Sequence, residues 1–146
     1  MGKHKVTWVD IENVDSPEDD LRFPGYDKGA AVFARGEGIW YGDKEVYFAC
    51  TNGGKIGAGQ VFRYTPSPDE GKPEEKSNPG ELTLFVESED REILKNCDNL
   101  AVAPWGDVIL CEDHKHPFLV GVTPKGELYH LAENIGFESE LAGGVF

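Results

Sequence analysis

Acidic residues recur at the ends of short apolar segments in this chain. Glu37 opens residues 37–41, Asp98 opens residues 98–102, and Glu112 and Asp113 end the segment that begins at Asp107. If these segments are paired antiparallel strands, the start of one lies beside the end of the next, and all four acids share one rim. Gathered carboxylate oxygens suit Ca²⁺ or Mg²⁺, and without a cation they have raised pKa values. We call Glu37, Asp98, Glu112 and Asp113 the rim acids, although each one taken alone is more typical of a turn or a cap.

A cation stands close to the first rim acid. Arg35 lies two residues before Glu37, and residues i and i+2 of an extended segment point to the same side. A guanidinium group matches phosphate oxygens with two parallel hydrogen bonds. The pair therefore predicts a phosphate contact at Arg35, and a purely structural Arg35–Glu37 ion pair is the competing interpretation.

Two histidines follow the last rim acids. His114 and His116 could bind a metal ion or transfer protons. Histidines in an exposed polar loop are more often simply solvated, and both interpretations stay open.

The three cysteines are not spaced as the ligands of a metal site or as the members of a disulfide framework are. Cys50, Cys97 and Cys111 are odd in number and form no CxxC pair, which argues against a disulfide framework and a zinc site. Cys50 and Cys111 take nearly equivalent positions at the ends of apolar segments, so we expect buried thiols.

The composition indicates a folded, turn-rich domain. The chain has 146 residues, of which 39% are hydrophobic, with 18 glycines and nine prolines and no low-complexity run. Many turns imply many short elements, which favours an all-β fold.

The charge excludes some partners. With 27 Asp and Glu against 14 Lys and Arg, the net charge of -13 repels nucleic acids and anionic membranes. No run approaches the roughly 20 apolar residues that cross a bilayer, and residues 1–14 contain no export signal. The residues alone do not indicate a compartment.

The predicted strands fall into two similar units. The first unit contains residues 37–41, 45–50, 60–64 and 81–86, and the second contains residues 98–102, 107–112, 118–122 and 127–131. Four antiparallel strands recurring every roughly 45–60 residues are typical of β-propeller blades. A simple meander of hairpins has a similar pattern.

We therefore expect one partial propeller domain over residues 1–146. Residues 1–28 form a leading strand (6–11) and an acidic connection with a helical turn starting at Ser16, residues 29–97 the first unit, residues 98–140 the second, and residues 141–146 the truncated start of a next strand. Residues 66–79, with four prolines, form an exposed excursion. Because two blades cannot close a ring, the chain is expected to be a fragment of a longer protein or to pair its edges with copies of itself.

Several motifs together resemble a known family. In order, these are Arg35-Gly-Glu-Gly38, Thr51-Asn-Gly-Gly54, Asp98-Asn-Leu-Ala101 with Pro104-Trp-Gly106, Cys111-Glu-Asp113 and Leu141-Ala-Gly143. This order resembles that of the PhoX-type alkaline phosphatases across residues 6–146.

The resemblance implies a six-bladed propeller that hydrolyses phosphate monoesters in the periplasm or outside the cell, as a monomer. Its central site would hold several Ca²⁺ ions and a pair of Fe³⁺ ions. By matching motif, Arg35 would contact the substrate phosphate. Glu37, Asp98 and Glu112 would bind metal, with Ca²⁺ the first choice, and Asp113 is a weaker candidate.

Two departures limit what the resemblance carries over. The chain stops where the family continues into a further strand, so the intact site is not expected in this fragment. The family's iron-binding cysteine and a further glutamate ligand lie in an upstream part without counterpart here, and none of the three cysteines takes that role. Two other classes stay open: a Ca²⁺-dependent propeller hydrolase such as a lactonase, and a non-enzymatic Ca²⁺-binding propeller fragment.

Overall fold

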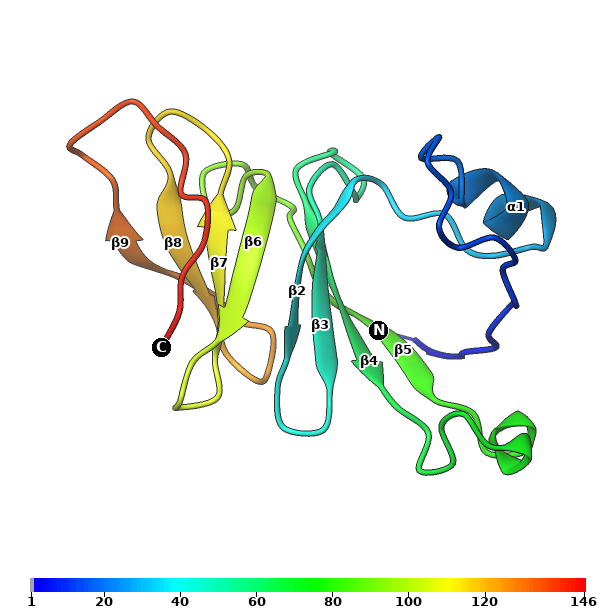
Figure 1. The fold of residues 1–146 in the computed structure, drawn as a ribbon. Helices are drawn as coiled ribbons and strands as arrows, with labels where there is room; N and C mark the ends of the chain where they lie inside the picture. The colour runs from blue at the N-terminus through cyan, green and yellow to red at the C-terminus, as the bar shows by residue number, and fades with distance from the viewer. Residues whose placement is uncertain (1) are drawn as a thin grey trace.

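The computed structural model describes residues 2–146 and consists of two antiparallel sheets (Figure 1). Met1, the first residue of the predicted leading segment, lies outside the described residues. The five-stranded sheet has the order β1-β5-β4-β3-β2, and its strands are β1 (Lys3–Lys5), β2 (Gly36–Tyr41), β3 (Val46–Cys50), β4 (Gln60–Thr65) and β5 (Glu81–Glu87). The four-stranded sheet has the order β6-β7-β8-β9, with β6 (Cys97–Val102), β7 (Val108–Glu112), β8 (Phe118–Val122) and β9 (Leu128–Glu133). The prediction of an all-β fold is confirmed, and the sheets have five and four strands where two four-stranded blades were expected.

Among the residues described, helix is confined to two short elements. Helix α1 (Arg22–Asp27) lies in the acidic connection and begins later than the predicted turn at Ser16. A 3₁₀ turn, η1 (Pro73–Lys76), lies in the proline-rich excursion. Within residues 2–146, no helix has the length and apolarity needed to cross a membrane.

The prediction of a strand over residues 6–11 is wrong. The leading strand is β1 instead, which pairs with residues 81–83 at the start of β5. The backbone N–H of Val6 donates to Gly80 O (2.9 Å), and beyond this point β5 offers no further backbone for a ladder. Trp8 packs edge-to-face against Tyr64 (ring centroids 5.6 Å apart), so side-chain packing holds the segment that backbone pairing does not.

Residues 141–146, predicted to begin a further strand, form no strand. Asn99 Nδ2 donates to Ala142 O (2.9 Å), and Trp105 packs edge-to-face on Phe146 (5.3 Å). The C-terminal segment therefore lies along the second sheet through single contacts and not through a ladder of backbone hydrogen bonds (Figure 1).

The two sheets meet along one edge strand of each. Strand β2 and strand β6 lie side by side (Figure 1), and a Cβ built on Gly38 would stand 2.7 Å from Asn99 Cα. Only glycine permits so close an approach of the two backbones. The buried core lies between the sheets and contains Ala49, Val61, Val86, Leu94, Cys97, Leu100, Leu110, Val120 and Val122. This packing fixes the two strands that carry Glu37 and Asp98.

Candidate functional site

Strands β2 and β6 begin in the same way. Arg35 (φ 51°) and Asn96 (φ 52°) both have the left-handed backbone conformation, and they directly precede β2 and β6. Thr51 N–H donates to Arg35 O (2.9 Å), as Asp113 N–H donates to Asn96 O (3.0 Å). This repeat makes Asp113 the counterpart of Thr51.

The register of the strands sets the remaining equivalences. Gly36 pairs with Cys50, and Cys97 pairs with Glu112, so Glu112 is the counterpart of Cys50. The near equivalence expected for Cys50 and Cys111 is therefore off by one residue. Glu37 and Asp98 follow Gly36 and Cys97 and hold equivalent positions in the two sheets.

Arg35 and Glu37 lie on the same side of the chain, as their spacing predicts. Arg35 Nη2 is 3.2 Å from Glu37 Oε1, and both side chains are partly exposed. An exposed ion pair of this kind contributes little to stability, whereas the left-handed conformation of Arg35 costs about 1 kcal/mol. Strain that local stability does not explain is typical of functional positions.

Asp98 lies in the field of several charged groups. Partial burial raises the pKa of its carboxyl group, and the negative charges of Glu37 and Asp113 raise it further. The Arg35 guanidinium and a hydrogen bond with Thr51 act in the opposite direction. Glu37, Asp98, Asp113 and Arg35 therefore form one electrostatic group across the β2–β6 junction.

A further acid that the sequence analysis missed belongs to the same region. The pKa of Glu140 is raised by a hydrogen bond with Asp113 and by the negative charge of Asp113, and more weakly by Asp98. Glu140 lies outside the repeated strand pattern, which is why no motif pointed to it. The signal in the sequence was the acid pair Glu138 and Glu140 just before residues 141–146.

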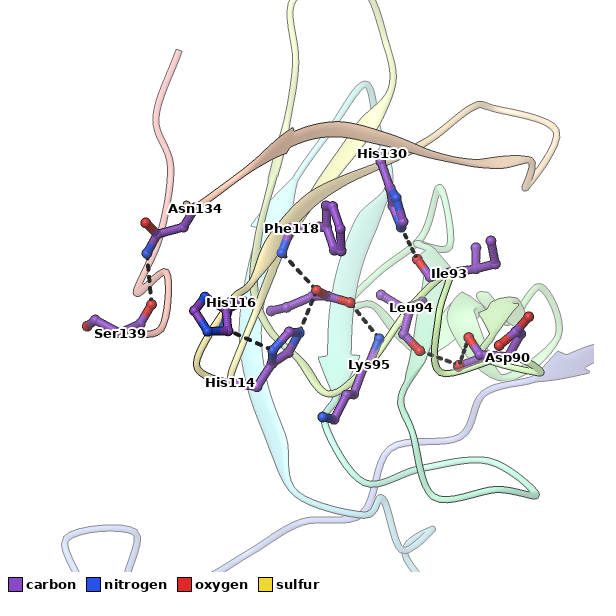
Figure 2. Close-up of polar contacts among 12 residues, drawn as sticks. Asp90, Ile93, Leu94, Lys95, His114, His116, Phe118, His130, Asn134 and Ser139 are labelled. Atoms are coloured by element: carbon purple, nitrogen blue, oxygen red, sulfur yellow. Dashed lines mark hydrogen bonds and ion pairs between the residues drawn. The ribbon is translucent and has the colours of Figure 1, made fainter. Parts of the chain in front are cut away.

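Glu112 lies apart from this group because its side chain turns into the second sheet. It is 1% exposed. Its Oε1 accepts a hydrogen bond from Lys95 N–H (2.6 Å), and its Oε2 accepts one from Phe118 N–H (2.8 Å) and contacts His114 Nε2 (2.8 Å) (Figure 2). Neighbouring residues on extended backbone point to opposite faces, so Glu112 and Asp113 diverge.

The two histidines differ in their surroundings. His114 is mostly buried and bound to Glu112, whereas His116 is exposed and donates a backbone N–H to His114 Nδ1 (3.4 Å). The structure thus makes His114 part of a hydrogen-bond network, and the solvated interpretation applies to His116.

The donor types near Arg35 suit a hard cation. Asp98, Asp113, Glu37 and Glu140 offer only carboxylate oxygens, and their mutual repulsion is what a divalent ion relieves. In the part of the chain that the structure describes, no three His, Cys, Asp or Glu side chains already stand together closely enough to hold a metal ion. A complete ion site would need these side chains to close up, or further donors such as backbone carbonyls or water.

The three cysteines do not fit an iron site. The three cysteines are free and buried, and burial raises the pKa of Cys97 to about 12 and that of Cys50 and Cys111 above its usual value. A buried thiol held protonated is a poor metal ligand. The chain's own cysteines therefore offer no iron site.

Two clefts lie away from the rim acids. One, of about 980 Å³, opens between the sheets and is lined by Arg63, Phe85 and Leu128 among others. The other, of about 510 Å³, lies on the five-stranded sheet beside Trp8 and Phe48. Their linings include neither Arg35 nor any rim acid, so size alone does not locate the candidate site.

Comparison with known proteins gives one match. A family model described as Alkaline phosphatase PhoX matches residues 2–144, nearly the whole chain. Searches of curated proteins and of solved structures found no match.

Proposed function

The chain belongs to the alkaline phosphatase PhoX family, and from this membership we propose that it acts in the hydrolysis of phosphate monoesters at the junction of β2 and β6. The observation that carries this proposal is the partly exposed Arg35 guanidinium, which lies beside Glu37 and close enough to Asp98 for its charge to lower the pKa of that carboxyl group. A phosphate ester needs both a bidentate cation and a concentration of positive charge near its oxygens. Arg35 supplies the first.

We propose Ca²⁺ as the source of the second. Glu37 and Asp98 are the proposed ligands, and Asp113 and Glu140, whose charges act on the same group, would complete the set once these side chains close up. When bound, Ca²⁺ would supply positive charge against the phosphoryl oxygens. Arg35 would then orient the phosphate and stabilise the charge that develops on it.

Two predicted metal contacts need separate comment. The resemblance gives Glu112 a ligand role, whereas its hydrogen bonds within the chain favour a supporting role. Any Fe³⁺ of the family site would need a cysteine ligand from outside this chain, since its own three cysteines are buried. The propeller ring, the monomeric state and a location in the periplasm or outside the cell belong to the same family-based proposal.

Two other functions use the same features. A Ca²⁺-dependent lactonase would keep the acids but would not need Arg35 to bind phosphate. A Ca²⁺-binding fragment without activity would bind the ion and turn over no substrate. Nothing at the junction favours an uncharged lactone over a phosphate, because the exposed Arg35 offers a charged partner.

The test is hydrolysis of a phosphate monoester by the full-length protein in the presence of Ca²⁺. Loss of a preorganised charge partner costs about 3 kcal/mol, so we expect Arg35→Ala to lower the rate about a hundredfold. Arg35→Lys should restore part of it, because an ammonium group keeps the charge but not the bidentate geometry.

Arg22→Ala is the matched control, since Arg22 is exposed and lies in α1 rather than at the junction. It should leave the rate unchanged. A full rate in the Arg35→Ala variant would remove the proposed role, and hydrolysis of lactones alone would favour the lactonase.

A further inference from the structure

Thr51 opens the motif Thr51-Asn-Gly-Gly54, which supplies no acid to the junction of β2 and β6. The residue directly follows β3 and is fully buried. Its backbone N–H donates to Arg35 O (2.9 Å), just before β2. Its hydroxyl group donates to Cys97 O (3.0 Å), in the first residue of β6. One buried residue therefore connects the starts of two strands that belong to different sheets.

Asn96 adds to this connection from the second sheet. Its Nδ2 donates to Thr51 O (3.2 Å) and to Asn52 Oδ1 (3.1 Å). Its own carbonyl group accepts the N–H of Asp113 (3.0 Å). Asparagine adopts the left-handed conformation found here (φ 52°) more readily than most residues do. Asn96 therefore holds the β3–β4 loop against the segment that leads into Asp98.

The connection joins groups that have different proposed roles. Arg35 lies before β2 and is proposed to bind phosphate, whereas Asp98 lies in β6 and is proposed to bind the cation. The Thr51 side chain also hydrogen-bonds with the Asp98 carboxyl group. Without the hydroxyl group, the carbonyl of the buried Cys97 would lose this donor, and a buried polar group without its partner is costly. We therefore expect the starts of β2 and β6 to move apart when the hydroxyl group is removed.

We propose that Thr51 is a positioning residue, which together with Asn96 holds Arg35 and Asp98 at the separation at which both act on one bound phosphate. The effect on phosphate binding rests on the proposed function. The hydrogen-bonded connection does not, and it can be tested without metal or phosphate.

The first test is amide hydrogen exchange, measured by NMR on the whole chain without metal. Thr51→Val keeps the shape of the side chain but removes the hydroxyl group. We expect the amides of residue 51 and Asp113, which donate to Arg35 O and Asn96 O, to exchange about tenfold faster or more relative to the core amide of Leu110. Thr51→Ser keeps the hydroxyl group and should restore most of the protection.

Ser67→Ala is the matched control for this test. Ser67 is also buried, and its hydroxyl group also donates to a backbone carbonyl, Asn78 O (2.6 Å), but in the proline-rich excursion. Its loss should leave the amides of Thr51 and Asp113 unchanged. Equal acceleration of all core amides in Thr51→Val, or no acceleration at residue 51 and Asp113, would overturn the connection.

Asn96→Gly replaces Thr51→Val if that variant does not fold. Glycine keeps the left-handed backbone conformation but removes both side-chain hydrogen bonds to the β3–β4 loop. The amides of Thr51 and Asp113 should again lose protection relative to Leu110. Full protection of both amides in this variant would also overturn the connection.

The second test is a double-mutant cycle on the chain saturated with Ca²⁺, with inorganic phosphate as the probe. Thr51→Val should weaken phosphate binding about tenfold, whereas Ser67→Ala should leave it unchanged. If Thr51 acts through Arg35, the two losses are not additive, and Thr51→Val should weaken binding less than about twofold in the Arg35→Ala background. A residue that only stabilised the fold would lower the affinity equally in both backgrounds.

Additive losses would overturn the positioning role, and so would unchanged phosphate affinity in Thr51→Val. If the wild type saturated with Ca²⁺ binds no phosphate, the proposed function fails. The amide exchange then still decides whether Thr51 connects the two strands.

Discussion

Asp98 lies between the negative charges of Glu37 and Asp113 and the positive charge of Arg35. Its pKa is raised, first by partial burial and then by the two carboxylates. The folded chain thus holds a proton on Asp98 at pH values where the unfolded chain has released it. Stability contributed in this way is present at low pH and is lost as pH rises through the raised pKa.

We expect the free energy of unfolding without Ca²⁺ to fall more steeply above about pH 4 in the wild type than in Asp98→Asn. Urea unfolding at a series of pH values measures this difference. Parallel curves for the two proteins would mean that Asp98 ionises as freely when folded as when unfolded.

The same repulsion predicts a response to Ca²⁺. At a free concentration of about one hundred times the dissociation constant, a ligand of the folded state adds about 2.7 kcal/mol, which raises the Tm of a chain this size by about 5–10 °C. We expect this shift in the wild type and its loss in the double variant Glu37→Gln with Asp98→Asn.

The control removes the same charges elsewhere. Asp43 and Glu133 are exposed and lie away from the junction, so Asp43→Asn with Glu133→Gln should keep the Tm shift. An equal shift in both double variants would place Ca²⁺ binding at other acids.

At the scale of elements, the contact between β2 and β6 determines how the acids meet. A methyl group on Gly38 would stand 2.7 Å from Asn99 Cα and 2.9 Å from Leu100 N, so the strands must separate. We expect Gly38→Ala to lower the free energy of unfolding by about 1–3 kcal/mol, as in other overpacked sites. Chemical denaturation measures this loss.

Gly36→Ala is the matched control in the same strand, because a Cβ there would meet no atom within 4 Å. It should be close to neutral. If both variants lost the same stability, the cost would come from changing a glycine in β2 and not from the approach of β6.

The elements were largely predictable because short apolar segments between glycine turns have a two-residue period. Strand β1 could not be predicted, because its three exposed residues become a strand only through pairing with β5. The positions of Glu112 and Asp113 show the same limit. Both end an apolar segment, but the register that turns one inward depends on a bulge between Cys97 and Asn99, which no local pattern reveals.

At the scale of the whole molecule, two sheets bring residues far apart in sequence to one junction. The equivalent positions of Glu37 and Asp98 were predictable because each acid opens an apolar segment at the same place in the repeat. The place of Glu140 in this group could not be predicted. Glu140 lies near Asp113 because of an irregular segment, which is held by single contacts such as the one from Asn99 to Ala142. The closed ring of blades remains part of the family-based proposal.

The central claim is that Arg35 and a cation at the rim acids together bind phosphate. Calorimetric titration of the chain with inorganic phosphate, with and without Ca²⁺, tests it most directly. We expect binding in the presence of Ca²⁺, little or none without it, and about a tenfold or greater loss in Arg35→Ala, as for a hydrogen bond to a charged group. Phosphate binding that depends on neither Ca²⁺ nor Arg35, or no binding to the Ca²⁺-loaded chain, would contradict the account.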